Sequence, residues 1–316
     1  MENNTPITEI SSASFHSKEI AREEYWGQIN AVLNQSRELQ KLLQLDSAHI
    51  QITKSNVVLD YKLWNDQRIK LVIPQNDLRT ASFTILANGN YESLLERTIF
   101  GLSELSDKFL DIGANMGFYA IGAALVNKKI EVIAFEPNPG IRNSLSENIR
   151  LNNVERNIQI LEFALSNFSG NANFSVPAFT GSGGGSLMNL HPEEGLPSEF
   201  SVSVEKLDNL SAKTSGADLV KIDVEGAEFQ LIQGAIQTLK ATRPTIVIEL
   251  LRKWMNPFGT TPQDVIDLLS NLEYICFAVG ETSIEQVTKI DASTVETNFI
   301  FCHKGNSRHL NMLKTN

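Results

Sequence analysis

The chain has 316 residues, 27 of them Lys or Arg and 37 Asp or Glu, which gives a formal net charge of −10. This charge argues against a general affinity for nucleic acids or anionic membranes, because both require clustered basic side chains. No apolar run approaches the ~20 residues of a membrane-spanning helix, and the polar first residues are not typical of a secretory signal. We therefore expect a cytoplasmic protein that binds neither nucleic acid nor membrane.

The N-terminal part of the chain differs in pattern from the rest. Residues 17–45 carry apolar side chains at helical spacing after Ser17, a suitable N-cap, which predicts an amphipathic helix. Its apolar face has to pack on the main domain or on a partner, and a homodimer through this helix is one option. Short β-like runs interrupted by Asn, Asp and Pro then predict a small antiparallel appendage at 49–53, 56–64, 68–74 and 81–87.

Short apolar strands alternate with amphipathic helices from residue 108 onward, after a helix expected at 91–105. This alternation predicts an α/β fold with a doubly wound, mostly parallel, Rossmann-like sheet of seven strands, covered by helices on both faces. The last two strands have no helix between them, so the final strand should run antiparallel. The expected strands are 108–113, 130–137, 157–165, 218–223, 244–250, 274–280 and 296–304.

We divide the chain into an N-terminal part, residues 1–90, and a catalytic domain, residues 91–316. The N-terminal helix and appendage would cap the site, set substrate choice or mediate oligomerisation. The catalytic domain carries an insertion near 177–198, which contains Gly181-Ser182-Gly183-Gly184-Gly185-Ser186. A run of this kind has little intrinsic structure, so it is either a flexible surface loop or a lid at the carboxyl edge of the sheet.

The residues at the ends of the strands point to a ligand site, because ligands of open α/β sheets bind beyond the carboxyl ends of the strands. Asp111-Ile112-Gly113-Ala114-Asn115-Met116-Gly117 ends the first strand in a Gly-x-x-x-Gly turn, unlike the Gly-x-Gly-x-x-Gly of dinucleotide-binding proteins. Glu136 ends the second strand, where an acid can accept both hydroxyls of a ribose. Asp223 and Glu249 end the fourth and fifth strands and face the same edge.

Two more acids come shortly after Asp223, although crowded carboxylates repel one another. Glu228 is expected in the first turn of the next helix, where its charge interacts favourably with the helix dipole. Glu225 precedes a glycine at the turn into this helix, and its role stays open between helix capping and the site.

Four motifs in correct order, DIGANMGFYA, FEPNP, LVKIDVEGAEFQLIQGA and RPTIVIEL, resemble the FkbM-type family of class I methyltransferases. The resemblance covers roughly residues 108–250 and does not extend to residues 1–90 or to the insertion. Asn115 departs from the glycine that is usual in the wider class but suits this family. The resemblance implies S-adenosyl-L-methionine as cofactor.

Residues of the matching motifs acquire roles through this resemblance. Those from Asp111 to Gly117 would cradle the methionine end of the cofactor, Glu136 would hold the ribose, and residues 162–165 would border the adenine. The implied cofactor-binding residues are Asp111, Gly113, Asn115, Gly117, Glu136, Asn138, Glu162, Ala164 and Asp223.

The resemblance also implies O-methylation of a hydroxyl on a small molecule such as a natural product, polyketide or sugar, and a peptide carboxylate stays open as an acceptor. The enzyme must align the acceptor oxygen, take up its proton and exclude water. Asp223 and Glu249 are candidates for the base or for orienting the acceptor, and His191 joins them if the insertion closes over the site. Carboxylates at this edge could also hold Mg²⁺, but we assign no metal.

Two other functions remain alternatives. One is a nucleotide-dependent oxidoreductase on a similar sheet, against which the Gly-x-x-x-Gly turn and Asp111 argue. The other is a non-catalytic module that binds S-adenosylmethionine or a nucleotide, which binding without turnover would favour.

Overall fold

The computed structural model describes residues 48–315, apart from 53–55, 75–76, 78–79 and 179–180. The helix predicted over 17–45, and with it the predicted homodimer contact, lies outside the described residues. Within the described part of the chain, no helix is long and apolar enough to cross a membrane. All described residues belong to one compact unit that spans 47–316.

An eight-stranded sheet organises this unit, with the strand order β13-β12-β14-β11-β10-β4-β5-β6. The five strands from β11 to β6 are parallel, β14 pairs antiparallel with β11 and β12, and β13 pairs antiparallel with β12. The predicted doubly wound, mostly parallel sheet is confirmed, and the final strand is antiparallel as expected. The strands are β4 (Lys108–Ile112), β5 (Glu131–Phe135), β6 (Ile158–Leu161), β10 (Leu219–Ile222), β11 (Thr245–Glu249), β12 (Tyr274–Val279), β13 (Ile284–Val287) and β14 (Asn298–His303).

All seven predicted strands are present, and β13 adds an eighth as the outermost strand of the sheet, beside β12. Its two central residues, Glu285 and Gln286, are exposed, so the apolar pattern that marks the other strands is missing here. An edge strand with one partner can be polar because most of its surface faces water.

Helices cover both faces of the sheet, so its central strands are buried on both sides. In β10 all four residues are buried. Val220 and Ile222 point to one face of the sheet, where they pack against α8, α9 and α11 in one core cluster. Lys221 and Asp111 point to the other face, which α5 covers. There Lys221 lies over the ring of Tyr119, and Asp111 accepts a hydrogen bond from the amide of Ala120. The helices that flank the sheet are α4 (Ser93–Glu104), α5 (Phe118–Val126), α6 (Pro139–Leu151), α8 (Glu228–Gln233), α9 (Ile236–Thr242), α11 (Pro262–Ser270) and α12 (Ser307–Thr315).

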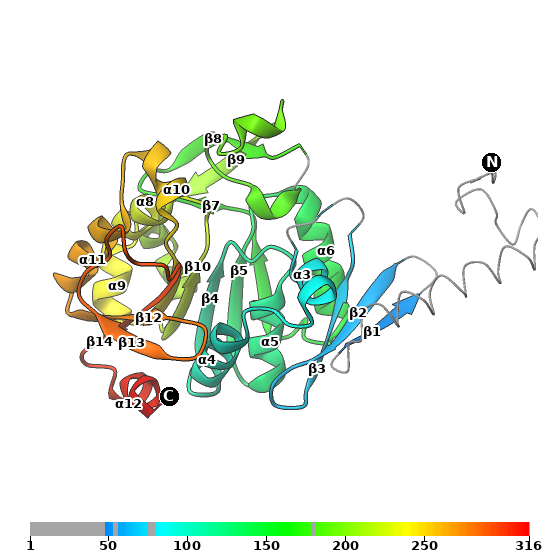
Figure 1. The fold of residues 1–316 in the computed structure, drawn as a ribbon, viewed down its shortest axis with the longest axis horizontal. Helices are drawn as coiled ribbons and strands as arrows, with labels where there is room; N and C mark the ends of the chain where they lie inside the picture. Colours follow the sequence, from blue (N-terminus) through cyan, green and yellow to red (C-terminus); the bar gives the residue numbers. More distant parts are fainter. Residues whose placement is uncertain (1–47, 53–55, 75–76, 78–79, 179–180, 316) are drawn as a thin grey trace, which may run out of the picture. The chain divides into compact units, whose positions relative to one another are not determined.

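The carboxyl ends of the parallel strands meet at one edge of the sheet. Figure 1 shows a second small sheet at this edge and α12 at the opposite edge, after the antiparallel β14. The small sheet has the order β7-β9-β8 and carries the predicted insertion between β8 and β9. Its elements and the short helices near this edge are β7 (Ala164–Leu165), β8 (Gly170–Val176), η2 (Ser182–Gly184), η3 (Pro192–Glu194), β9 (Ser198–Glu205), α10 (Arg252–Met255) and η5 (Asn256–Phe258). Two further short helices, η4 (Leu207–Leu210) and α7 (Ser211–Thr214), lead from β9 to the amino end of β10.

The predicted antiparallel appendage forms from three strands, β1 (Ala48–Ile52), β2 (Val57–Lys62) and β3 (Arg68–Val72). It is fixed to the main domain through α6, where Asn148 Oδ1 accepts a hydrogen bond of 2.7 Å from the backbone of Val72. The appendage therefore shares hydrogen bonds with the helix that comes after Glu136.

The prediction of a strand at 81–87 is wrong, because this segment forms α3 (Ala81–Asn88). Thr80 caps its N-terminus by accepting a hydrogen bond from the amide of Phe83, and Gly89 ends it with a φ of 82°. A hydroxyl N-cap and a glycine in the left-handed region favour a helix between them, and they outweigh the β-branched residues inside.

Candidate active site

A cavity of about 350 Å³ lies at the carboxyl ends of the parallel strands. Its walls come from the turns after β4, β5, β10 and β11, from residues after β6, from the segment before α4, and from the insertion. Small-molecule sites have volumes of about 300–1,000 Å³, so this cavity can hold a ligand of that kind. Polar and charged side chains that line it include Tyr91, Glu92, Asn115, Tyr119, Glu136, Lys221, Asp223, Glu225 and Glu249.

The turn between β4 and α5 forms one wall, and its backbone requires unusual conformations. Gly113 and Gly117 have φ values of 79° and 92°, and Asn115 has a φ of 49°. A Cβ atom on Gly113 would overlap the carbonyl oxygen of Asp223, so only glycine lets the ends of β4 and β10 approach this closely. Asn115 tolerates its conformation because its Oδ1 accepts a hydrogen bond of 2.7 Å from the amide of Met116.

Glu136 presents its carboxylate to the cavity at the end of β5. Its two oxygens accept hydrogen bonds of 2.9 Å from the amides of Asn115 and Asn138. Burial raises the pKa of Glu136 to about 7, and the two amides oppose this shift only in part. A carboxylate has about four acceptor positions, so each oxygen can still accept a hydrogen bond from a ligand.

The chain after β6 contributes an apolar wall made of Phe163, Ala164 and Leu165. Glu162, which the resemblance placed beside the adenine, does not line the cavity. Its carboxylate forms an ion pair of 2.8 Å with Arg142, and its side chain is 72% exposed. An apolar wall of this kind suits an aromatic ring, whereas Glu162 faces the outer surface.

Three other predicted cofactor residues lie behind the cavity wall. Asp111 is buried, and its Oδ2 accepts a hydrogen bond of 2.9 Å from the amide of Ala120 at the start of α5. Asn138 caps α6, and Gly117 precedes α5 against the side chain of Leu145. These residues hold the turns in place, and their direct contact with a cofactor stays a prediction.

Lys221, which is buried, and Asp223, which is partly exposed, form an ion pair at the end of β10. Lys221 Nζ lies 3.0 Å from Asp223 Oδ2 and 5.1 Å from the centre of the Tyr119 ring. Burial alone would lower the pKa of Lys221, but the carboxylates of Asp223, Asp111 and Glu92 raise it above its ordinary value. The ammonium therefore stays charged.

Glu92 reaches the cavity from the N-terminal end of α4. The Tyr119 hydroxyl donates to its Oε2 at 2.6 Å, and the Asn298 amide donates to its Oε1 at 3.3 Å. Glu92 has a φ of 46° and a ψ of 53°, which is rare for a residue with a side chain, and it makes no side-chain cap to its helix. Burial raises its pKa above the ordinary value.

Glu249 ends β11 beside Asp223 and lines the same cavity. Burial raises its pKa well above the ordinary value, and the nearby carboxylates of Asp223, Glu225 and Glu92 add to this shift. Burial therefore favours the protonated form of Glu249, whereas Asp223 has a cationic partner. Two acids in one cavity with different electrostatic surroundings are suited to different roles in proton transfer.

The acids after Asp223 take separate positions. Glu228 is the first residue of α8, as expected, and its Oε1 accepts a hydrogen bond of 2.9 Å from the amide of Gly226. Glu225 has a φ of 50° and lines the cavity, and its backbone carbonyl accepts a hydrogen bond of 2.7 Å from Ser186 Oγ. Ser186 belongs to the insertion, which also places Gly183, Gly185 and Leu187 at the cavity.

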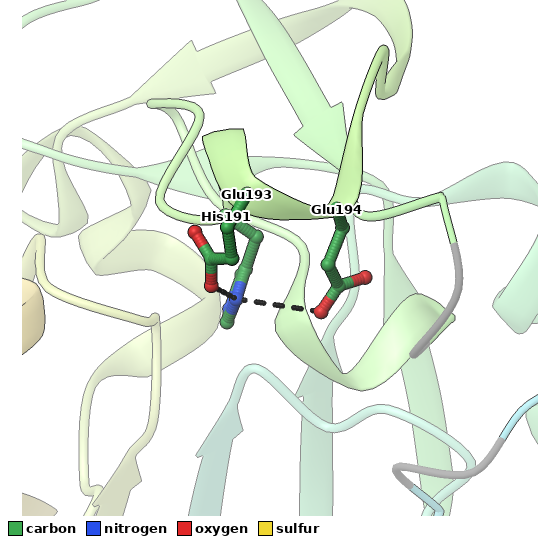
Figure 2. Close-up of side chains that lie close together, drawn as sticks. All are labelled: His191, Glu193 and Glu194. Carbon is green, nitrogen blue, oxygen red and sulfur yellow. Dashed lines mark hydrogen bonds and ion pairs between the residues drawn. The ribbon is translucent and has the colours of Figure 1, made fainter.

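His191 lies in the same insertion but does not line the cavity. Its buried ring packs against Trp254, with 4.5 Å between the ring centres. Figure 2 shows its Nδ1 between the carboxylates of Glu193 and Glu194, at 3.3 and 3.6 Å. Within the described ranges, His191, Glu193 and Glu194 are the one group of three His, Cys, Asp or Glu side chains whose nitrogen, sulfur or oxygen atoms lie close enough together to bind one metal ion. A role of His191 as base stays a prediction that requires the insertion to move.

Three cavity residues and Asn298, which donates to one of them, could not be found from the sequence by inspecting only the turns after the strands. Tyr91 and Glu92 precede a helix, Tyr119 lies within α5, and Asn298 begins β14 opposite Glu249. One signal was available: Glu92 stands where Ser, Thr, Asp or Asn would cap α4 better.

Comparisons with known proteins agree with these features. A family model described as the Methyltransferase FkbM domain matches residues 111–276. The hexuronic acid methyltransferase AglP of Haloferax volcanii is 28% identical over 174 residues, which cover 55% of this chain and 66% of that protein. The chain thus spans less than two thirds of this relative.

Solved structures with a related arrangement are more distant in sequence. The methyltransferase FkbM from Methylobacillus flagellatus matches 62% of this chain and 43% of its own, at 16% identity and a TM-score of 0.41. The O-methyltransferase TomG from Streptomyces achromogenes, which is involved in tomaymycin synthesis and was solved with S-adenosylmethionine, matches 65% and 78% of the two chains, at 13% identity and a TM-score of 0.37.

The matched segment contains the glycine turn after β4, Glu136, and the acids that end β10 and β11. It covers more than half of the 316 residues. The four motifs follow one another along the chain in the same order as β4, β5, β10 and β11, whose ends build the cavity. This chain belongs to the FkbM methyltransferase family.

Proposed function

We propose that this protein is an S-adenosylmethionine-dependent O-methyltransferase that acts on a hydroxyl of a small molecule. The observation that carries the proposal is the cavity in which the Gly113 turn, Glu136 and two partly buried acids, Asp223 and Glu249, meet at the carboxyl edge of the sheet. Membership of the FkbM family and the methyltransferase activity in the name of the Haloferax relative support it.

The donor groups of the cavity fit this cofactor. Glu136 keeps acceptor positions for two ribose hydroxyls, and Phe163 with Ala164 and Leu165 offers an apolar wall for the adenine. Gly113 and Asn115 expose backbone to the methionine end, and Asp223 lies at the neighbouring strand end, where a carboxylate favours a positive charge. When bound, the cofactor supplies an electrophilic methyl group.

The chain's own residues would divide the remaining work. Asp223 is our first candidate for the base, because its carboxylate lines the cavity and Lys221 compensates its charge. It would take the proton of the acceptor hydroxyl as the oxygen–carbon bond forms. Glu249 lies beside Asp223 in the same cavity, so it would form a hydrogen bond that orients the acceptor. The insertion would exclude water, since Gly183, Gly185 and Leu187 lie at the cavity.

Calorimetry tests the cofactor first. We expect saturable binding of S-adenosylmethionine and S-adenosylhomocysteine at one site and no binding of NAD. Binding of NAD without S-adenosylmethionine would favour the oxidoreductase alternative and sink the proposal. Binding of S-adenosylmethionine with no S-adenosylhomocysteine formed from any hydroxyl compound would favour the non-catalytic module.

Asp223→Asn and Glu249→Gln then separate the two acids. The expected result is a large loss of kcat for Asp223→Asn with affinity for S-adenosylhomocysteine, which lacks the sulfonium charge, nearly kept, and a higher KM for the acceptor in Glu249→Gln. Full activity in both variants would remove both acids from the mechanism.

A further inference from the structure

The cavity wall formed by the segment before α4 lies outside the part of the chain that matches the family. Tyr91 and Glu92 precede residue 111, where the match begins, and Asn298, which donates to Glu92, comes after residue 276, where it ends. Residues outside a shared catalytic framework are suited to selecting a particular substrate. This wall is therefore where the acceptor class of this protein should be encoded.

Glu92 is positioned for the cavity and not for its helix. Its left-handed backbone and its missing cap bond give α4 no benefit. The side chain turns inward instead, where Tyr119 and Asn298 hold its two oxygens. Both of these donors are neutral, so they orient the carboxylate without compensating its charge.

Charge along the cavity is strongly one-sided. Five lining residues carry carboxyl groups, Glu92, Glu136, Asp223, Glu225 and Glu249, whereas Lys221 is the one cationic residue among the described lining residues. Lys221 already pairs with Asp223 at 3.0 Å. Burial outweighs the attraction of Lys221 at Glu92 and Glu249, so a ligand with a positive charge would favour the ionised forms of both acids, and a ligand with a carboxylate would be repelled.

Aromatic rings next to these acids add a second feature of cation binding. Tyr91 lines the cavity, and its ring lies 4.9 Å from Phe118 and 6.0 Å from Tyr119, between ring centres. The faces of aromatic rings attract ammonium groups, and the ring of Tyr119 already lies under the ammonium of Lys221. Carboxylates and aromatic rings together are the chemistry that recognises an amine.

We propose that Tyr91, Glu92 and Glu249 form an amine subsite that binds a protonated amine on the methyl acceptor. The acceptor is then a hydroxyl compound that also carries an ammonium group, and it is not a uronic acid. This inference rests on the proposed function, because it assigns the other half of the cavity to the cofactor. The amine is held and is not methylated.

A matched set of three sugars tests the amine subsite in protein saturated with S-adenosylhomocysteine. The probes 6-amino-6-deoxyglucose, glucose and glucuronic acid differ only in the group at C6, which is an ammonium, a hydroxyl or a carboxylate at pH 7. We expect the amino sugar to bind about tenfold more tightly than glucose, as one charge-assisted hydrogen bond allows, and glucuronic acid to bind most weakly.

Glu92→Gln keeps the shape of the side chain and an oxygen for the Tyr119 hydroxyl. It should reduce the preference for the amino sugar over glucose to less than about threefold, whereas Glu104→Gln, at the exposed end of the same helix, should keep it. Melting temperature and affinity for S-adenosylhomocysteine show whether each variant is folded.

Proton release gives a second readout that a merely structural role of Glu92 would not change. Burial raises the pKa of Glu92 and of Glu249, and an ammonium beside them should lower both pKa values, which releases protons at any pH where these acids are partly protonated. Calorimetry in two buffers with different ionisation enthalpies should detect this release in the wild type and less of it in Glu92→Gln.

Three outcomes would overturn the amine subsite: equal or tighter binding of glucuronic acid, no detectable binding of the amino sugar, or an unchanged preference in Glu92→Gln. Each is measured in protein that binds S-adenosylhomocysteine, so the proposed function survives them. Failure of S-adenosylhomocysteine to bind would instead count against the proposed function itself.

Discussion

The ammonium of Lys221 lies 3.0 Å from the carboxylate of Asp223, and both side chains come from the same end of β10. Residues two positions apart in a strand point to the same face, so the pair stands on the side of the sheet that α5 covers. The side chain of Lys221 is 8% exposed and that of Asp223 is 31% exposed. The ion pair thus joins the sheet interior to the cavity.

Replacing Asp223 alone should lower the free energy of unfolding more than replacing both Lys221 and Asp223. Asp223→Asn leaves a buried ammonium with weaker compensation, so we expect a loss of about 3 kcal/mol in the free energy of unfolding. Adding Lys221→Met should restore much of this loss. Urea unfolding of the two single variants and the double variant measures the coupling.

The exposed pair of Lys62 and Asp66, 2.6 Å apart, is the matched control. Lys62→Met and Asp66→Asn should couple by less than about 0.5 kcal/mol, because water screens exposed charges. If the unfolding free energies lost in Lys221→Met and Asp223→Asn simply add up in the double variant, then these two charges do not stabilise each other either.

Glu136 should determine cofactor affinity. Glu136→Gln removes the charge and replaces one acceptor oxygen by a donor, so we expect S-adenosylhomocysteine to bind roughly 10- to 100-fold more weakly. Calorimetry measures the dissociation constant. Glu131→Gln is the control, since Glu131 begins the same strand at the opposite edge of the sheet and is exposed. Equal affinities of the two variants would contradict a role of Glu136 at the ribose.

Gly113 allows a test that separates backbone strain from steric overlap. Gly113→Ala should cost at least about 3 kcal/mol, because the new Cβ meets the carbonyl oxygen of Asp223 and the φ of 79° is also unfavourable. Gly216 has a φ of 78° and open space around a new Cβ, so Gly216→Ala should cost only about 1 kcal/mol. Chemical unfolding gives both values, and similar losses would show that the close approach of β4 and β10 adds no constraint.

Glu96 makes stability depend on pH. It is 2% exposed, and burial raises its pKa from 4.5 to about 7, although the amide of Trp64 and the hydroxyl of Tyr61 both donate to it. Between these two pH values the folded state binds more protons than the unfolded state, so its stability falls as pH rises. Asp111, Glu136 and Glu228 shift in the same direction.

Glu96→Gln should remove this dependence at one position. The stability of the variant relative to the wild type should increase by up to about 3 kcal/mol between pH 4.5 and pH 8. Urea unfolding at several pH values in this range measures the difference, and the other acids cancel because both proteins share them. Parallel curves for the two proteins would show that Glu96 ionises normally.

Much of the fold could be predicted because strands of a covered parallel sheet are continuous apolar runs, as β10 shows with four buried residues. The exceptions have local causes. The β-branched residues of α3 suggest a strand, but Thr80 and Gly89 cap a helix, and β13 is too polar to stand out.

The candidate site divides in the same way. Gly113, Glu136, Asp223 and Glu249 lie at the ends of parallel strands, whose carboxyl ends must meet, so their proximity is a consequence of the order of the elements. Glu92 and Asn298 meet only because α4 and the antiparallel β14 pack at the same edge. No periodicity in the sequence encodes that contact. Glu162 lies between β6 and β7, and Asn138 caps α6. In such short connections a shift of one residue changes whether a side chain faces the cavity, so the sequence does not settle their orientation.

The hydrogen bond between Glu92 and Asn298 joins positions 206 residues apart, which has a consequence for the order of folding. β14 inserts between β11 and β12, so β12 cannot join the sheet until residues near the end of the chain are available. By contrast, the turns after β4 and β5 and the wall after β6 come from one continuous stretch, residues 108–165. On the ribosome, the half of the cavity with the glycine turn can therefore assemble early, whereas the contact that holds Glu92 in the acidic half can form only after β14 has been synthesised.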